Sequence, residues 1–133
     1  MKARSIPKSK AKNAYDLLSE VRALILEEPK RYDQNCWIDR RPGQDRPFCH
    51  KSPPCDTVGC IAGWIVTLKG PKQWNDDDTR AIANTIIGVD TGHFFDGTSV
   101  LGTPQTVVHA RAGSARIRKF QREHKAALKA KAV

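Results

Sequence analysis

TVGCIAGWIVTLKG, residues 57–70, is the stretch of this sequence that decides the fold. It carries one charge, at Lys69, and its large apolar residues recur at the three- and four-residue steps of an α-helix. Those residues are Val58, Ile61, Ile65 and Leu68. Because the run is well short of the roughly 20 apolar residues that cross a bilayer, the pattern predicts a buried helix of a soluble domain over residues 57–69.

Both ends of this helix are marked in the sequence. Asp56 or Thr57 is expected to cap the N-terminus by accepting the first free backbone N–H groups. Gly70 and the proline after it are expected to end the helix, glycine through a left-handed conformation and proline by blocking continuation. Gly59 and Gly63 lie one turn apart, where the missing side chains allow another helix to cross closely.

A helix is also predicted over residues 13–28. Asn13 is expected to cap it, with Asp16 three residues later as in a capping box, and Pro29 is expected to end it. Its apolar residues recur with helical spacing and are expected to form the buried face. They are Leu17, Leu18, Val21, Leu24 and Ile25.

A third helix is predicted over residues 78–88, where Gly88 marks its end. Three acidic residues, Asp76, Asp77 and Asp78, lie at its start. Carboxylates in this position cap free N–H groups and interact favourably with the helix dipole. Because three consecutive side chains point in different directions, the pattern favours capping over metal binding.

The fourth predicted helix covers residues 104–126, with Thr103 as its N-cap and Pro104 in its first turn. Helical periodicity divides its residues into two faces. The face expected to dock on the domain contains Ala110, Gly113, Ile117, Phe120 and His124. The opposite face is basic and contains Arg111, Arg118, Arg122, Lys125 and Lys129.

The sequence therefore predicts an all-α fold, a small four-helix domain around a buried central helix at about residues 57–69. Residues 13–126 are expected to form this single domain, in which the proline-rich residues 29–56 are a long irregular loop. Residues 1–12 are expected to be a basic flexible arm, and residues 127–133 a basic tail.

The formal net charge of +9 is concentrated at the two ends of the 133-residue chain. Residues 1–12 contribute +5 and residues 111–133 contribute +7, whereas residues 13–110 sum to −3. An acidic body with basic ends is common in proteins that bind nucleic acid or another polyanion. Basic ends also promote solubility, so the charge distribution leaves both interpretations open.

Four cysteines, at positions 36, 49, 55 and 60, lie within 25 residues of one another and close to His50. Cys36, Cys49, Cys55 and Cys60 are candidate zinc ligands, but they lack the two close pairs of a zinc knuckle. The spacing favours structural roles, with Cys60 in the core and Cys55 at the helix entrance. Cys60 in a first helical turn is also a candidate reactive thiolate, for which His50 is the nearest base. Without a recognisable Cys/His signature, we expect no enzyme activity.

Residues 55–64, CDTVGCIAGW, resemble the motif C-G-T-x-x-C-I-A-G-W/H of a group of small uncharacterised bacterial and phage proteins. The resemblance covers roughly residues 13–123 and includes residues 28–34, 81–89, 94–95 and 116–120. Asp56 stands where the group commonly has glycine. The resemblance implies the helical architecture and a bacterial or phage origin, but it implies no activity and no ligand.

We therefore expect a non-catalytic binding protein that contacts nucleic acid or a nucleoprotein complex through its N-terminal arm and its basic C-terminal helix. The expected contact residues are Lys8, Lys10, Lys12, Arg111, Arg118, Lys119, Arg122, Lys125 and Lys129. One alternative is a phage-type inhibitor of a host defence protein, and another is a zinc-stapled interaction module. No cofactor other than this zinc, and no membrane partner, is expected. Because no apolar run follows Lys2 and Arg4, the expected location is the cytoplasm of a bacterial cell or phage-infected host.

Overall fold

The computed structural model describes residues 8–32, 60–70, 78–90, 102–103 and 105–133. In these residues the chain is helical, as predicted, and an antiparallel bridge pairs Asn13 with Ala132. The helices are α1 (Ala14–Glu27), a short 3-10 helix η1 (Pro29–Arg31), α2 (Ile61–Lys69), α3 (Thr79–Ile87), α4 (Val107–Glu123) and α5 (Lys125–Ala130). None of these helices is both long enough and apolar enough to cross a membrane.

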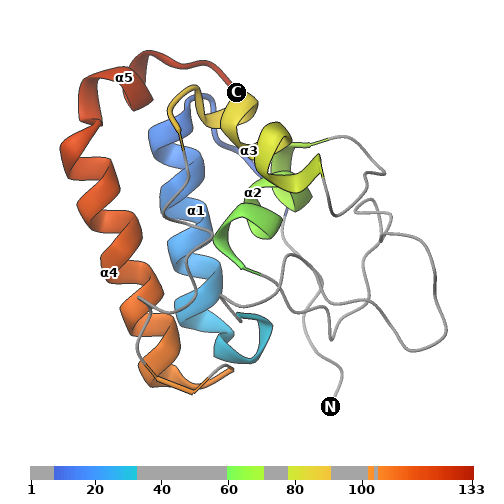
Figure 1. Ribbon diagram of the computed structural model, residues 1–133, viewed down its shortest axis with the longest axis vertical. Coiled ribbons are helices and arrows are strands. Elements are labelled where there is room, and N and C mark those ends of the chain that lie inside the picture. The colour runs from blue at the N-terminus through green and yellow to red at the C-terminus, as the bar shows by residue number, and fades with distance from the viewer. Residues whose placement is uncertain (1–7, 33–59, 71–77, 91–101, 104) are drawn as a thin grey trace, which may run out of the picture.

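Helix α1 lies in the middle of the arrangement (Figure 1). It packs against α4 on one side and against α2 on the other, while α5 packs across its N-terminal end. Helix α3 packs against α2. The prediction of a buried helix near residues 57–69 is confirmed for α2. The helix between the others, however, is α1, which has α4 and α5 on one side and α2 on the other.

Helix α1 follows its sequence pattern closely. The side chain of Asn13 caps the helix by accepting a hydrogen bond from the backbone N–H of Asp16 at 2.8 Å. All five residues of the predicted apolar face are buried, namely Leu17, Leu18, Val21, Leu24 and Ile25. The α-helix ends at Glu27, and Pro29 begins η1.

Helix α2 is buried over its first seven residues, Ile61–Thr67, and it ends at Lys69 before Gly70 as predicted, but its predicted start and the predicted conformation of Gly70 are wrong. The N-cap is Cys60 rather than Asp56 or Thr57, and its Sγ accepts a hydrogen bond from the N–H of Gly63 at 3.4 Å. Gly70 ends the helix in an extended conformation, with φ −84°, rather than a left-handed one. A hydrogen-bond acceptor three residues before Gly63 thus decides where the helix begins.

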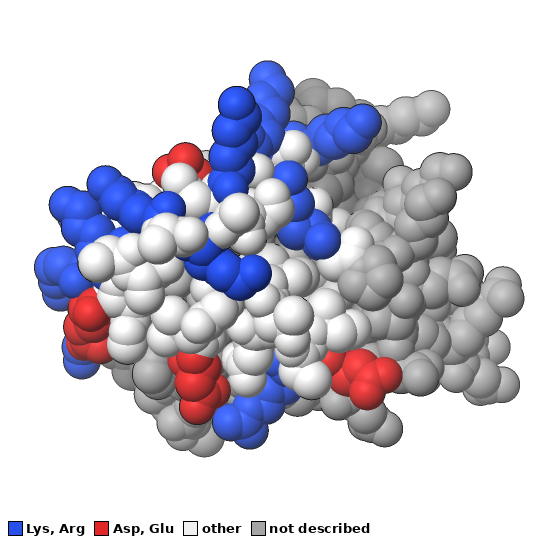
Figure 2. Space-filling view, turned by 90° about the horizontal axis from the view of Figure 1, so that it is seen from above, with Lys and Arg blue, Asp and Glu red and all other residues white. Residues whose placement is uncertain are grey.

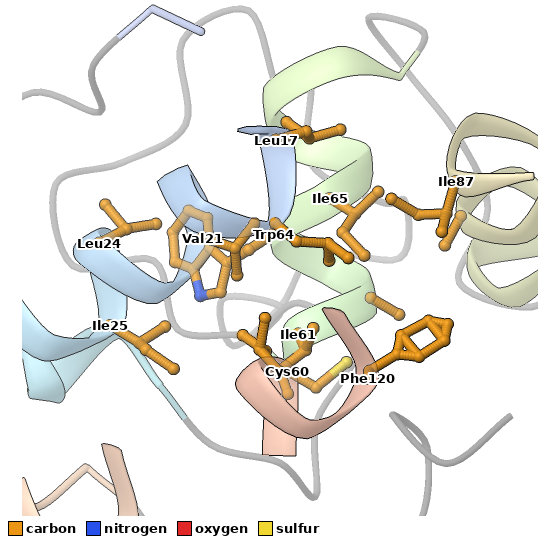
Figure 3. Close-up of a cluster of buried hydrophobic side chains, with 14 of the residues drawn as sticks. Leu17, Val21, Leu24, Ile25, Cys60, Ile61, Trp64, Ile65, Ile87 and Phe120 are labelled. Atoms are coloured by element: carbon orange, nitrogen blue, oxygen red, sulfur yellow. The ribbon is translucent and has the colours of Figure 1, made fainter. Parts of the chain in front are cut away.

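The core is formed where α1, α2, α3 and α4 meet (Figure 3). Trp64 is the largest fully buried side chain, and Ile65 of α2 points toward Ile87 of α3. Phe120 extends from α4 into the same cluster. Burying a large apolar side chain contributes roughly 1.5–3 kcal/mol each, so this shared cluster is what holds the four helices together.

Helix α3 begins where it was predicted, but without the predicted side-chain cap, whereas α4 begins later than predicted. Asp78 is the N-cap residue of α3, but its side chain makes no capping hydrogen bond, while Asp76 and Asp77 lie outside the described residues. Helix α4 is capped by Thr106, whose Oγ1 accepts from the N–H of His109 at 3.3 Å, so Thr103 is not its cap. At the other end of α3, Gly88 adopts the left-handed conformation expected of a terminal glycine, with φ 77°.

The two-faced character of α4 is confirmed. Its predicted inner face is buried at Ala110, Gly113, Ile117 and Phe120, whereas His124 is half-buried. The prediction of one helix to residue 126 followed by a tail is wrong, because α4 ends at Glu123 and α5 follows immediately. Leu128 of α5 is fully buried, which fixes this second helix on the domain.

The 3-10 helix η1 sets the position of the N-terminal end of α4. Trp64 Nε1 donates to the carbonyl of Arg31 at 2.8 Å, and the backbone N–H of Gln105 donates to the carbonyl of Tyr32 at 2.9 Å. The ring of Tyr32 stacks on His109, with centroids 4.7 Å apart, and packs closely on Gly113. Arg31 and Tyr32 thus link α2 and α4 through one short segment.

Candidate polyanion-binding surface

The two ends of the described chain are joined by backbone hydrogen bonds. The N–H of Ala14 donates to the carbonyl of Lys131 at 2.8 Å, and the N–H of Val133 donates to the carbonyl of Lys12 at 3.1 Å. The side chain of Lys131 also packs on Gly88, where a Cβ would lie 3.0 Å from its Cδ. The two basic ends of the sequence, predicted as separate segments, therefore meet at one place.

Residues 8–12 lie along α1 instead of forming a flexible arm. Ser9 Oγ donates to Glu20 Oε1 at 2.5 Å, and the backbone N–H of Lys10 donates to Glu20 Oε2 at 2.8 Å. Ala11 is buried in the core. The expectation of mobility is thus wrong for these five residues, while residues 1–7 lie outside the described part of the chain.

All nine predicted contact residues are exposed in the structure. They are Lys8, Lys10, Lys12, Arg111, Arg118, Lys119, Arg122, Lys125 and Lys129. We call these nine residues and Lys131 the terminal basic surface. They lie in residues 8–12, on the exposed face of α4, and in and just after α5. Lys119 lies toward its border and approaches Glu123, with Nζ and Oε1 4.0 Å apart.

Helices α1, α4 and α5 are held in register where this surface forms. Gln121 Nε2 donates to the carbonyl of Tyr15 and to Ser19 Oγ, both at 2.9 Å. The ammonium group of Lys129 lies 5.1 Å from the centroid of the Tyr15 ring, within the range of a cation–π interaction. The second contact places Lys129 of α5 beside the first turn of α1.

Positive charge predominates on this end of the molecule. Figure 2 looks onto the α5 end and shows more Lys and Arg than Asp and Glu side chains there. Two acidic residues near these cations already have partners, since Glu20 of α1 binds Ser9 and Lys10 and Glu123 of α4 approaches Lys119. Such a surface attracts polyanions over a distance set by the ionic strength.

Arg22 on α1 borders the terminal basic surface and was missed by the sequence reasoning. Its Nε donates to Ser114 Oγ of α4 at 3.2 Å. Burial, and then the positive charge of Arg118, lower the pKa of Arg22 below its usual range, against a smaller opposing effect of Tyr15. No pattern in the sequence reveals this neighbour, because it depends on which side of α1 faces α4.

The structure assigns Cys60 a structural position, buried at the start of α2. The other three zinc candidates, Cys36, Cys49 and Cys55, lie outside the described residues, as does His50. Within the described ranges no three His, Cys, Asp or Glu residues gather in a group suited to a metal ion. Zinc binding by the four cysteines stays a prediction.

A groove between α2 and α3 is a second concave feature. It is lined by Lys69, Gly70, Asp78, Ala81, Ile82, Thr85 and Ile86. Its two charged side chains have opposite signs, so they provide no net attraction for a polyanion. The terminal basic surface is therefore the stronger candidate site.

Comparison with known proteins identified no relative of this chain. No protein-family model matches the chain, and no match was found among curated proteins or among solved structures.

Proposed function

We propose that this protein is a non-catalytic binding protein that contacts nucleic acid, free or in a nucleoprotein complex, through the terminal basic surface. The observation that carries the proposal is the pairing of the chain ends between Lys12–Ala14 and Lys131–Val133. This pairing gathers cations from both ends of the sequence onto one surface. Simple solubility does not require such a fixed arrangement, because scattered charges serve it equally well.

The chemistry of the surface favours phosphate contacts over base reading. Its side chains are lysines and arginines in exposed positions, which neutralise phosphates without reading sequence. Each neutralised phosphate releases counterions, so the logarithm of the affinity falls with the logarithm of salt concentration by about 0.9 per contact on duplex DNA. We therefore expect binding that is strong at low salt, steeply salt-dependent and indifferent to sequence.

The test is a titration of fluorescent duplex DNA and single-stranded RNA at several salt concentrations. In the variant Arg118→Glu, Arg122→Glu, Lys125→Glu we expect affinity to fall by roughly tenfold or more at low salt. The matched control, Lys30→Glu, Lys69→Glu, Arg80→Glu, changes the net charge equally but lies off the terminal basic surface. Failure of the wild type to bind either polymer, or equal losses in the two variants, would contradict the proposal.

A truncation tests the pairing of the chain ends. Removing residues 131–133 deletes both backbone hydrogen bonds between them while leaving the cations of α4 in place. Each such bond contributes about 0.5–1.5 kcal/mol to stability, so the variant should fold with reduced stability. We expect the truncated protein to bind nucleic acid more weakly than the variant Lys131→Ala, which loses the same positive charge but keeps both backbone hydrogen bonds.

A protein partner is the second candidate, since exposed aliphatic side chains occur at the opposite end of the α1–α4 pair. Leu26, Val107 and Val108 are 42 %, 52 % and 61 % exposed. An inhibitor of a host protein would be expected to use such apolar side chains together with charge. Pull-down from host lysate with and without nuclease separates the candidates. One stoichiometric partner that persists after nuclease treatment would favour inhibition, and loss of all partners would favour nucleic acid.

A further inference from the structure

Arg22 of α1 is restrained by a side-chain hydrogen bond to a second helix, α4. Its Nε donates to Ser114 Oγ at 3.2 Å, and Ser114 is only 5 % exposed. Ser114 is flanked on α4 by Arg111 one turn before it and by Arg118 one turn after it. The guanidinium group of Arg22 is therefore fixed beside the row of arginines on α4.

Arg118 lies one turn after Ser114 on α4, and Arg22 contacts Ser114, so the two guanidinium groups lie near each other. Consistent with this, Arg118 lowers the pKa of Arg22. Among the described residues, neither guanidinium group has an acidic group within 4.0 Å. The residues one turn away on their own helices are also uncharged or basic. They are Leu18, Ser19, Ile25 and Leu26 on α1, and Ser114, Ala115, Gln121 and Arg122 on α4.

Repulsion between Arg22 and Arg118 raises the free energy of the folded protein, and a bound anion would reduce this repulsion. Arginine stays protonated at neutral pH, so two neighbouring guanidinium groups, one of them half-buried, repel each other in the folded protein. A guanidinium group presents its donors in a fixed fork that matches the oxygens of a phosphate group. Because Ser114 already restrains Arg22, little side-chain entropy is left to lose on binding.

We propose that Arg22 and Arg118 form a seat for one phosphate group, with Ser114 as the positioning residue that holds Arg22. This inference rests on the proposed function, because it names one restrained phosphate contact at the terminal basic surface. In a nucleic acid the seated group is a backbone phosphodiester. A free phosphate compound offers the same chemistry, and the experiment separates the two sources.

The first experiment is an NMR titration of the full chain that follows the arginine Nε–Hε signals. The probes are inorganic pyrophosphate and a short single-stranded DNA, each compared with sodium chloride at equal ionic strength. We expect the signals of Arg22 and Arg118 to shift with both probes, and that of Arg80 on α3 to stay unchanged. Ser114→Ala should reduce the shift of Arg22 by releasing its side chain, although the charge is retained.

The second experiment measures the salt dependence of DNA binding. Arg22→Gln is expected to lower the slope of log affinity against log salt by about 0.7 on single strands, the value for one lost phosphate contact. The matched control Arg80→Gln removes the same charge from an exposed arginine outside the surface and should leave the slope unchanged. Circular dichroism confirms that each variant is folded.

The outcomes separate this inference from the proposed function. If DNA binds but Arg22→Gln behaves like Arg80→Gln and the Arg22 signal does not move, the seat is wrong while the proposed function stands. If pyrophosphate shifts Arg22 and Arg118 but neither DNA nor RNA binds, the seat stands and the proposed function is wrong. If no probe moves the two signals beyond the sodium chloride control, the seat is wrong whatever else binds.

Discussion

Helices α2 and α4 differ in how much of their surface is buried. Helix α2 is buried over Ile61–Thr67, and the described charge it carries, Lys69, is at its last residue. Helix α4 buries one face and exposes arginines on the other. Apolar contact on several sides makes α2 essential for folding, whereas the exposed face of α4 contributes little to the core.

The difference separates stability from binding within a small domain. Substitutions in α2 and on the inner face of α4 should lower the free energy of unfolding, because they disturb close packing. Substitutions on the exposed face of α4 should change stability by no more than about 0.5 kcal/mol, since surface positions rarely do more. Three substitutions, from α2 to the outer face of α4, test this division.

The largest effect is expected for Trp64→Ala in α2. Trp64 is fully buried and its Nε1 donates to the carbonyl of Arg31, so its removal leaves a cavity and an unpaired carbonyl. We expect the free energy of unfolding, measured by urea titration, to fall by about 3–5 kcal/mol. Trp64→Phe keeps most of the apolar contact and should lose clearly less. A loss for Trp64→Ala below about 1 kcal/mol would show that α2 is not the packed centre of the core.

A smaller loss is expected for Gly113→Ala on the inner face of α4. A Cβ at this position would lie 2.5 Å from Cε2 of Tyr32, so the ring must move. Overpacking of this kind costs about 1–3 kcal/mol, although alanine alone would favour the helix by about 1 kcal/mol. In a Tyr32→Ala background the same change should be neutral or stabilising. Thermal unfolding of the four proteins of this double-mutant cycle measures the coupling.

The smallest effect is expected for Lys119→Ala on the outer face of α4. Its side chain is 72 % exposed, and it pairs with Glu123, which lies one helical turn later. Exposed pairs of this spacing contribute about 0.3–0.5 kcal/mol, so chemical denaturation should show a loss no larger than that. DNA affinity should fall less than in Arg122→Ala, because Glu123 already offsets the charge of Lys119. Equal losses of affinity would place Lys119 fully within the binding surface.

Sequence periodicity was sufficient to predict the faces of the helices. The apolar stripe of α1 and the inner face of α4 are buried as expected, since a spacing of three and four residues places side chains on one side of any helix. The caps at Asn13 and Gly88 were also found, because each lies next to a clear change of pattern. These features depend on residues close together in the chain.

Other boundaries were missed for reasons that lie outside the local pattern. Cys60 and Thr106 cap their helices in place of the predicted residues, because each has its acceptor atom within reach of an N–H three residues later. The break at His124 and the docking of α5 depend on the burial of Leu128 against the rest of the domain. Helical propensity alone favoured a continuous helix there.

The sequence by itself determined that this chain is helical, that α4 has a buried and a basic face, and that positive charge is concentrated at both chain ends. Only the tertiary structure decided that those ends meet, through the pairing of Lys12 and Ala14 with the last three residues. It also decided that Arg22 lies beside Ser114, 92 residues later in the sequence. The physical reason is that periodicity fixes the side of a helix on which a residue lies, whereas its neighbours depend on how separate helices pack.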